Sequence, residues 1–310
     1  MRRIDMRIAI MGTGGVGGFF GAKLAASGAD VTFIARGAHG AAIAERGLTI
    51  DSPAHPVAGL AVRVTDDPAR VGPVDVVMVA VKLWDTAAAA EQLRPMVGPD
   101  TVVISFQNGI EAGPLLQAAL GPAHVAGGVA HISATIAAPG VIRQVGSLAR
   151  IIFGAFGGGT DPRLAAFSEA CRAAGIEHTL SPDIDRAIWE KFVFLSAFSA
   201  ITALTRKPIG DIRTDADLRA FLRDAASETA AVARAGGVAI APEQVDKVLA
   251  AADNLPAATR ASMAHDLERG ARLELPWLSG TVVKLGAELG VPTPVHRAVW
   301  CALKLHAGGR

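Results

Sequence analysis

The chain has 310 residues, 51% of them hydrophobic, and its 30 basic and 29 acidic residues give a formal net charge of +1. This length and composition predict a folded protein of two domains, because single hydrophobic cores rarely grow beyond about 250–300 residues. No stretch gathers Lys and Arg into a stripe that would neutralise phosphates, which argues against a nucleic-acid partner.

The first half of the chain alternates short apolar runs with alanine-rich segments. Nearly continuous apolar runs predict buried parallel strands at residues 7–11, 30–35, 75–81 and 101–105. Helices are expected at 16–27 and 86–96, and the strand–helix alternation favours a doubly wound α/β sheet. Asp5 and Arg7 interrupt the first apolar segment, so the N-terminus resembles a short lead before a strand and not a signal peptide.

The pattern of residue types changes in the second half of the chain. Residues 124–136 and 141–154 flank a Pro-Gly turn signal and predict a hairpin, followed by a helix at 163–174 and a strand at 175–180. After Pro182 the chain becomes rich in alanine and leucine, with about six helices expected. We therefore predict an α/β domain at 1–181 and an all-helical domain at 182–310.

Two further features bear on location. The longest candidate membrane segment, residues 192–204, is shorter than the roughly 20 residues that a spanning helix needs, so a buried helix is expected and no membrane partner. Cys171 and Cys301 lie far apart in sequence, which favours two buried thiols in a reducing compartment, by default the cytoplasm, and no metal site.

A glycine-rich motif follows the first predicted strand and opens the first predicted helix. The motif consists of Gly12, Thr13, Gly14, Gly15, Val16 and Gly17. In the pattern G-x-G-x-x-G the first glycine makes the tight turn, the second lets backbone approach a pyrophosphate, and the third lets the helix pack closely on the strand. This order of strand, loop and helix predicts a Rossmann-type dinucleotide-binding domain, although a glycine-rich turn without a ligand is the alternative.

The second predicted strand indicates which dinucleotide binds. NAD-binding proteins usually carry an acidic residue at the tip of this strand, whereas an arginine suits the 2′-phosphate of NADP. Here the strand ends in Arg36, without Asp or Glu, which favours NADP(H) over the alternative of a solvated loop arginine.

Composition limits the groups that could move a proton in a nicotinamide enzyme. The chain has no tyrosine, which excludes a Tyr/Lys mechanism, and no Cys/His cluster that would hold zinc. Lys191 stands near the start of a predicted apolar helix, where burial and the positive helix end would lower its pKa and let it protonate a ketone oxygen. The alternative is a lysine that reaches water and pairs with Asp185 or Glu190.

An ordered set of motifs covers nearly the whole chain. After the glycine motif come Val81-Lys82, Gln107-Asn108-Gly109, Trp189-Glu190-Lys191, Ser262-Met263-x-x-Asp266 and Glu274. This set resembles the ketopantoate reductase (2-dehydropantoate 2-reductase) family. The resemblance implies a Rossmann domain, a helical domain like that of 6-phosphogluconate dehydrogenase, and a site in the cleft between them. It also implies NADPH-dependent reduction of a 2-keto acid to a 2-hydroxy acid, in pantothenate biosynthesis from ketopantoate to pantoate.

The resemblance also implies roles for single residues. Lys191 would be the general acid and base, and Glu274 would hold a substrate hydroxyl or set the charge of the lysine. Ser262 would bind the substrate carboxylate, Asn108 would lie by nicotinamide and substrate, and Lys82 would lie at the cofactor edge. Turn chemistry for Asn108, helix capping or packing for Ser262 and simple exposure for Glu274 are the alternatives.

The sequence departs from the family pattern at the substrate positions. Family members typically carry asparagines four and eight residues after the lysine, where this chain has Leu195 and Ser199, and Pro276 stands where an aspartate is common. Losing a hydroxyl-binding amide suggests a less polar substrate or looser preference. A related β-hydroxyacid dehydrogenase, or a non-catalytic NADP(H)-binding regulator, therefore remains an alternative, and the sequence leaves a homodimer open.

Overall fold

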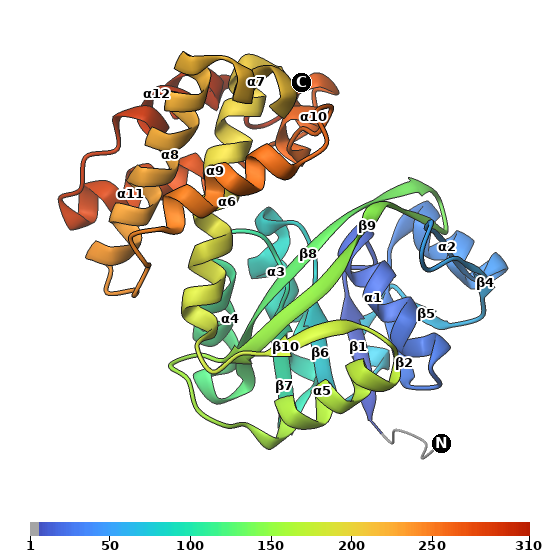
Figure 1. The fold of residues 1–310 in the computed structure, drawn as a ribbon. Coiled ribbons are helices and arrows are strands. Elements are labelled where there is room, and N and C mark those ends of the chain that lie inside the picture. Colours follow the sequence, from blue (N-terminus) through green and yellow to red (C-terminus); the bar gives the residue numbers. More distant parts are fainter. Residues whose placement is uncertain (1–5) are drawn as a thin grey trace. The chain divides into compact units, whose positions relative to one another are not determined.

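The computed structural model describes residues 6–310, so the lead at residues 1–5 lies outside the described part. The chain divides into two compact units between Ile184 and Asp185, slightly after the boundary predicted at 181/182. The first unit is an α/β sheet with helices and the second consists of helices (Figure 1). The predicted fold class, a Rossmann-type domain followed by an all-helical domain, is confirmed.

All four strands predicted in the first half are present and pair in parallel. They are β1 (Arg7–Met11), β2 (Asp30–Ile34), β6 (Val74–Val79) and β7 (Val97–Ser105), in the spatial order β7-β6-β1-β2. Only β7 differs much from expectation, because its first residues, including a Gly and a Pro, are too polar to be recognised as a strand. Since the strands are parallel, their carboxyl ends lie at one edge of the sheet.

A long antiparallel hairpin extends this sheet. Strand β8 (Val125–Ala138) pairs in parallel with β7 and turns at Pro139-Gly140 into β9 (Val141–Ala155), as predicted. Gly140 has φ +83°, a left-handed conformation that favours glycine. The short strand β10 (Glu177–Leu180) then pairs with β9.

Several short elements of the first unit were not predicted. They are α2 (Gly37–Arg46), β3 (Leu48–Asp51), β4 (Val57–Leu60), β5 (Arg63–Thr65) and α4 (Ala112–Leu120). The three strands are short and lie at or near the sheet edges, in the order β4-β3-β9-β8-β7-β6-β1-β2-β5, where few apolar residues are needed. Short 3₁₀ helices occupy Pro68–Arg70, Leu83–Asp85, Arg94–Met96 and Pro122–His124.

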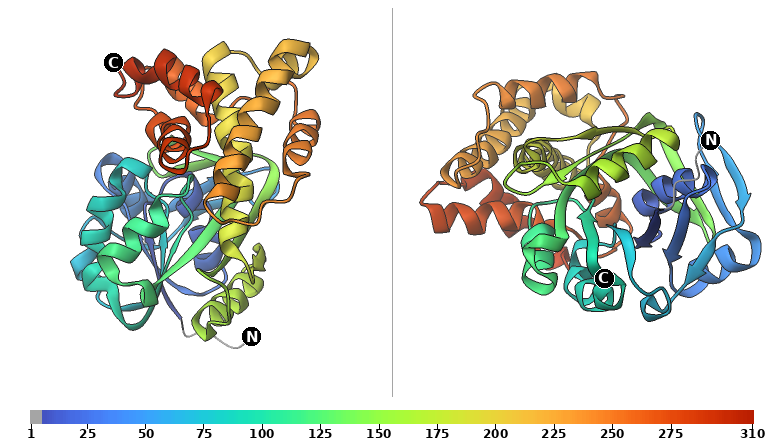
Figure 2. Two further views of the ribbon diagram at one scale, coloured as in Figure 1. Left: turned by 90° about the vertical axis from the view of Figure 1, so that its left-hand side faces the viewer. Right: turned by 90° about the horizontal axis from the view of Figure 1, so that it is seen from below.

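Helices cover both faces of the sheet (Figure 2). Helices α1 (Gly15–Ala26) and α5 (Pro162–Ala173) pack on one face with alternate strand residues such as Ile8 and Ile10. Helices α3 (Thr86–Leu93) and α4 pack on the other face, against Ala9 and Met11. A Cβ on Gly21 would lie 2.6 Å from the Phe33 ring, so the glycines of α1 allow it to lie close to the sheet.

The second unit contains seven α-helices within the described residues, where about six were expected. They are α6 (Ile184–Thr205), α7 (Ile209–Thr214), α8 (Ala216–Ala235), α9 (Gln244–Asn254), α10 (Ser262–Glu268), α11 (Ser279–Leu289) and α12 (Pro294–Leu303), with 3₁₀ turns at Leu275–Trp277 and Lys304–His306. Apolar residues of α6, including Val193, Ala197 and Ile201, pack with those of α8 and α9 in one core.

Helix α6 is longer than the apolar run that predicted it. With 22 residues it is long and apolar enough to cross a membrane, but 56% of its most apolar window is buried inside the protein. This is weak evidence for a membrane span, because the core helix of a soluble protein meets the same criterion.

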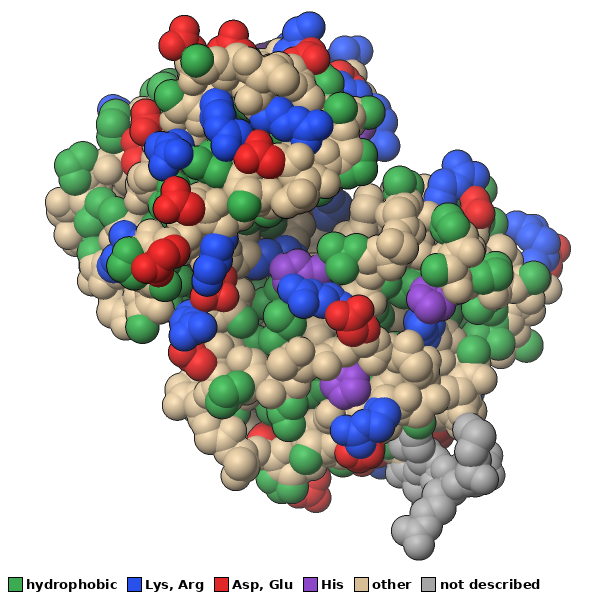
Figure 3. All heavy atoms as spheres, in the orientation of Figure 1, with side chains coloured by type: hydrophobic (Ala, Val, Ile, Leu, Met, Phe, Trp, Pro, Cys, Tyr) green, Lys and Arg blue, Asp and Glu red, His purple; other side chains and the backbone are tan. Residues whose placement is uncertain are grey.

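The two cysteines differ in their surroundings. Cys171 on α5 is buried as expected, and burial raises the pKa of its thiol to about 12. The expectation for Cys301 is wrong, because it lies exposed on α12 between the buried residues Val299 and Leu303. Among residues 6–310, no group of three or more His, Cys, Asp or Glu side chains could hold a metal ion. On the face shown in Figure 3, basic and acidic side chains are interspersed.

Candidate active site

The structure places the predicted cofactor-binding residues of the first unit at one edge of the sheet. Gly12 follows β1, Arg36 follows β2, Lys82 follows β6, and Asn108 follows β7, each just past the carboxyl end of its strand. Because β7, β6, β1 and β2 are parallel neighbours, these positions adjoin one another. Ligands of open α/β sheets bind at this edge.

The glycine loop has the geometry that a dinucleotide requires. Gly12 has φ +99°, and a Cβ there would lie 2.8 Å from the backbone nitrogen of Val81. A Cβ on Gly17 would lie 2.2 Å from the carbonyl oxygen of Gly12, so the start of α1 packs directly on the loop. A Cβ on Gly14 would meet nothing within 4 Å, which leaves room for a diphosphate at the N-terminus of α1. The loop therefore fits a dinucleotide.

The other loop residues serve packing. Thr13 is buried, and its Oγ1 donates a hydrogen bond to the Ile34 carbonyl at 2.9 Å. A Cβ on Gly15 would lie 2.1 Å from the Ala134 carbonyl oxygen of β8, a constraint that the G-x-G-x-x-G pattern does not contain. Val16 is half-buried against the core on that face of the sheet.

Gln107 is a residue of this edge for which no role was predicted. Its buried side chain donates hydrogen bonds to the Val81 carbonyl at 3.0 Å and to Thr86 Oγ1 at 2.8 Å. It thereby ties the loop that carries Asn108 to the loop that carries Lys82. The motif Gln107-Asn108-Gly109 was the available signal, but it did not distinguish a ligand contact from a scaffold contact.

Three predicted cofactor residues have distinct local settings. Arg36 is exposed and stands at the N-cap position of α2, where its side chain makes no capping hydrogen bond. The Lys82 ammonium lies 5.5 Å from the centre of the Trp84 ring. Asn108 is partly buried and precedes Gly109, whose φ of +76° shows that the expected turn is present. The turn is compatible with a ligand contact from the amide.

In the second unit, Lys191 lies on α6 with part of its side chain accessible to solvent. Burial of the ammonium lowers its pKa to about 8, against an attraction from the Glu274 carboxylate that raises it. The helix begins at Ile184, so Lys191 lies about two turns inside it. The helix N-terminus was expected to help lower the pKa of Lys191. Its effect fades within the first turn, so at this distance it contributes little, and burial is the main cause of the lowered pKa.

Glu274 lies just before the 3₁₀ turn Leu275–Trp277 and is only 5% exposed, which disfavours a simple surface carboxylate. Its effect on the pKa of Lys191 means that the two charged groups are near each other within this unit. Glu190, one of the alternative partners expected for the lysine, forms an ion pair with Arg186 at 3.1 Å.

A stripe along α6 continues from Lys191 towards the end of the helix. Leu195, Ser199 and Thr202 follow it on the same face, because offsets of four, eight and eleven residues return near the same direction. Leu195 is half-buried, whereas Ser199 is 1% exposed and its Oγ has no hydrogen-bond partner among residues 6–310.

Ser262 lies at the far end of this stripe. Ala261, immediately before it, donates its N–H to Thr202 Oγ1 at 3.3 Å. The backbone of Thr202 lies about 16 Å further along the axis of α6 than that of Lys191. Ser262 is exposed at the first position of α10, where the N-cap residue is Ala261, so N-capping does not explain Ser262.

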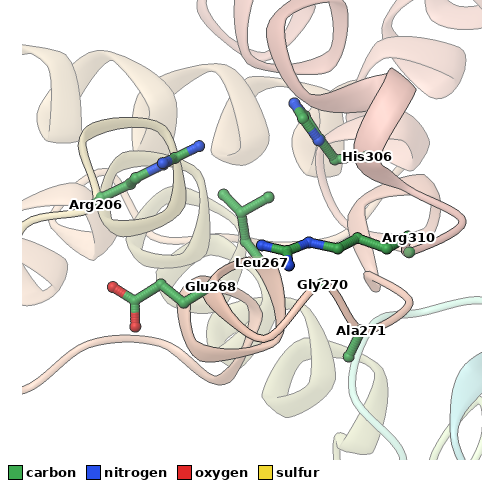
Figure 4. Close-up of a pocket in the computed structure, with 8 residues that line it drawn as sticks. Arg206, Leu267, Glu268, Gly270, Ala271, His306 and Arg310 are labelled. Atoms are coloured by element: carbon green, nitrogen blue, oxygen red, sulfur yellow. The ribbon is translucent and has the colours of Figure 1, made fainter.

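A separate cavity in the second unit is lined by none of the predicted site residues. Its volume is about 230 Å³, and its lining consists of Arg206, Leu267, Glu268, Gly270, Ala271, His306, Gly309 and Arg310 (Figure 4). Glu268 already pairs with Arg260. We therefore do not assign this cavity to the predicted substrate site.

The fold and the two sets of residues define a class: an oxidoreductase with a Rossmann-type cofactor domain and a helical domain that carries a half-buried lysine with a lowered pKa. The family model described as ketopantoate reductase PanE/ApbA matches residues 8–158, and the model of its C-terminal part matches residues 183–307. The chain belongs to the ketopantoate reductase family, as its motifs predicted.

Individual proteins agree with this assignment. The 2-dehydropantoate 2-reductase of Mesorhizobium japonicum is 32% identical, with 95% of each chain covered. The crystal structure of 2-dehydropantoate 2-reductase from Geobacter metallireducens is 31% identical, has a TM-score of 0.90, and covers 97% of this chain and 99% of its own. A D-mandelate dehydrogenase solved with NADH and anilino(oxo)acetate is 20% identical and shares the fold, with a TM-score of 0.88 over 97% of this chain and 98% of its own. The protein is thus an oxidoreductase of this family with a Rossmann-like domain.

Proposed function

We propose that the protein reduces a 2-keto acid to a 2-hydroxy acid with NADPH, that 2-dehydropantoate is the leading substrate, and that Lys191 is the general acid. The names of the relatives at about 30% identity support this substrate. The observation that carries the proposal is the lysine itself, since burial on an apolar helix lowers its pKa to about 8 while the Glu274 carboxylate attracts its charge.

The chemistry needs one hydride and one proton. A bound nicotinamide cofactor supplies the hydride to the keto carbon. Lys191 donates a proton from Nζ to the keto oxygen, which becomes the hydroxyl of the product. With a pKa of about 8, most of the ammonium is charged at pH 7, yet it gives up its proton more readily than an ordinary lysine. Glu274 helps to keep that proton in place by favouring the charged form.

The choice of NADPH rests on Arg36. Its side chain is exposed at the tip of β2, and no capping bond to α2 engages it. A guanidinium in this position suits the 2′-phosphate, which NADH lacks.

The stripe on α6 refines the substrate. Leu195 stands one turn after Lys191 and offers no hydrogen bond, so we infer that the part of the substrate beside it is less polar than a hydroxyl group. Ser199 is 1% exposed and its Oγ is buried, which disfavours the direct substrate contact expected at this position. Asn108, Lys82 and Ser262 keep the roles that the family resemblance implies as part of this proposal. For Ser262 this role requires the substrate carboxylate to point from Lys191 along α6 towards Thr202.

The test is a panel of 2-keto acids, including 2-dehydropantoate, assayed by NADPH consumption. The wild type should turn over at least one of them, and Lys191→Ala should lose about 100-fold or more in rate. Lys247→Ala, which removes an exposed lysine from α9, is the matched control and should keep normal activity.

Different results would separate the alternatives. Cofactor binding without turnover of any keto acid would favour the regulator. Faster oxidation of a β-hydroxy acid than reduction of any 2-keto acid would favour the related dehydrogenase. A Lys191→Ala variant with normal activity would overturn the assignment of the acid.

A further inference from the structure

His39 connects three segments around the glycine loop, although no role was predicted for it. It lies in the first turn of α2, partly buried. Its Nε2 lies 2.9 Å from the carbonyl oxygen of Thr13, and its Nδ1 accepts a hydrogen bond from the N–H of Gly140 at 3.0 Å. The imidazole therefore joins α2, the glycine loop and the turn of the β8–β9 hairpin.

These two contacts determine the protonation of the ring. The Gly140 N–H can only donate, so Nδ1 must be unprotonated, and the Thr13 carbonyl can only accept, so Nε2 must carry the hydrogen. His39 is thus a neutral imidazole that donates to the loop from Nε2. Burial lowers the pKa of His39, which favours the same neutral form.

The bond to Thr13 also orients the next amide of the loop. In a trans peptide the C=O of one residue and the N–H of the next point in opposite directions. Since the Thr13 carbonyl is held towards His39, the Gly14 N–H is aimed the opposite way. The Thr13 side chain is held as well, through its bond to the Ile34 carbonyl, so the peptide has little freedom to rotate.

We propose that His39 is a positioning residue for the cofactor: by holding the Thr13 carbonyl, it presents the Gly14 N–H to the diphosphate of the dinucleotide. Gly14 is the loop residue with open space beside it, as a diphosphate would need. The diphosphate is common to NADH and NADPH, so this inference stands apart from the proposed NADPH preference and from the role of Lys191.

The experiment measures cofactor dissociation constants directly, by calorimetry on the purified full-length protein without substrate. His39→Ala should weaken NADPH and NADH by the same factor, about 10-fold, which corresponds to the loss of one well-placed hydrogen bond. At saturating cofactor, kcat should change less than about twofold while the KM for the cofactor rises. This split separates positioning from a role in the chemical step.

Two conservative variants dissect the contacts. The amide nitrogen of His39→Gln can reach the position of Nε2 and restore the bond to Thr13, whereas His39→Asn is shorter and can replace only the acceptor for Gly140. The His39→Gln variant should therefore bind both cofactors more tightly than the His39→Asn variant. In ¹⁵N spectra of the wild type, the His39 ring should show the tautomer with hydrogen on Nε2.

His124→Ala is the matched control. That imidazole also bonds a backbone carbonyl, of Thr101 at 3.0 Å, but on β7 several residues before its carboxyl end. It should leave the cofactor constants unchanged. If His39→Ala folds and binds both cofactors within twofold of wild type, the proposal is overturned, even if the variant melts at a lower temperature. If His39→Ala does not fold, the Gln and Asn variants decide, and equal binding by the two overturns it.

Discussion

Lys191 shows how one residue can be charged and still reactive. Burial and the Glu274 carboxylate act on its pKa in opposite directions, and the balance leaves it at about 8, below the ordinary value of 10.5. Burial alone would carry the pKa further down and leave less of the charged form, whereas a fully exposed ammonium would hold its proton more tightly.

This balance predicts the pH dependence of the reaction. In the proposed mechanism reduction needs the charged form of Lys191, so kcat/KM for the keto acid should fall above about pH 8, by about tenfold per pH unit. Glu274→Gln removes the attraction and lowers the pKa of the lysine. The fall in kcat/KM, which is the falling limb of the pH profile, should therefore begin at a lower pH. Glu190→Gln alters a carboxylate that pairs with Arg186 and should leave the limb in place. A limb that stays near pH 8 in Glu274→Gln would contradict the coupling.

Arg36 allows a second prediction on single residues. Arg36→Ala removes the guanidinium at the tip of β2 and should raise the Kd for NADPH by about 10- to 100-fold, since a charge-assisted bond to phosphate is lost, while NADH binding should hardly change. Arg46→Ala, an exposed arginine at the other end of α2, serves as control. Equal weakening of both cofactors in Arg36→Ala would remove the NADPH preference.

At the scale of elements, α6 determines what lies beside the lysine. Its fixed rise and periodicity line up the half-buried residues Lys191 and Leu195 on one face, so a change at Leu195 alters the surface beside the lysine without moving it.

The third prediction concerns Leu195. Leu195→Asn introduces an amide one turn from the lysine, so kcat/KM for 2-dehydropantoate should rise about tenfold relative to the same keto acid without its hydroxyl group. Leu195→Met, which keeps the position apolar, should not change this ratio. Steady-state rates on the two keto acids give the answer, and an unchanged ratio in Leu195→Asn would mean that this position does not contact the substrate hydroxyl.

The elements that could be predicted well from the sequence are those marked by a continuous apolar run or by a turn-forming residue pair. The buried strands β1, β2 and β6 were found because continuous apolar runs of this length are typical of strands covered on both faces. The turn at Pro139-Gly140 was found because a Pro-Gly pair is typical of turns. Helix α4 and the edge strands were missed because short, partly polar segments carry no such pattern.

For the site, the family motifs predicted the candidate residues but not the contacts that hold them in position or shift their pKa values. The G-x-G-x-x-G spacing indicated a dinucleotide, but the contacts of His39 with Thr13 and Gly140 join positions up to 101 residues apart and leave no trace in local sequence. The opposing effect of Glu274 on Lys191 likewise depends on the folded chain.

At the scale of the whole molecule, the two units have separate cores and depend on different polar groups. In the second unit His296 is fully buried, donates from Nε2 to the Ala225 carbonyl at 3.0 Å and contacts Ser279 Oγ at 3.1 Å. It thereby holds α8, α11 and α12 together. Burial lowers its pKa to about 4, from an ordinary value of 6.5.

The last prediction follows from this buried histidine. The unfolded chain takes up the proton below about pH 6.5, whereas the folded unit resists protonation down to about pH 4, so stability is lost as the pH falls through this window. Between pH 7 and pH 5 the loss should be about 2 kcal/mol. Urea unfolding followed by tryptophan fluorescence can measure it, since Trp189, Trp277 and Trp300 all lie in this unit. His296→Gln should flatten the dependence, and an equally steep loss in that variant would assign it to other groups.

The hairpin turn at Gly140 has a consequence for engineering. Exposed hairpin tips are ordinarily chosen for inserting reporter peptides or for opening a chain into a circular permutant, because their backbone makes few contacts with the rest of the protein. Here the Gly140 N–H is bonded to His39, which in turn bonds the glycine loop, so an insertion at this tip would disturb nucleotide binding from a distance. The turn at Gly72, where an added Cβ would meet nothing within 4 Å, is the better place to open the chain or add a label.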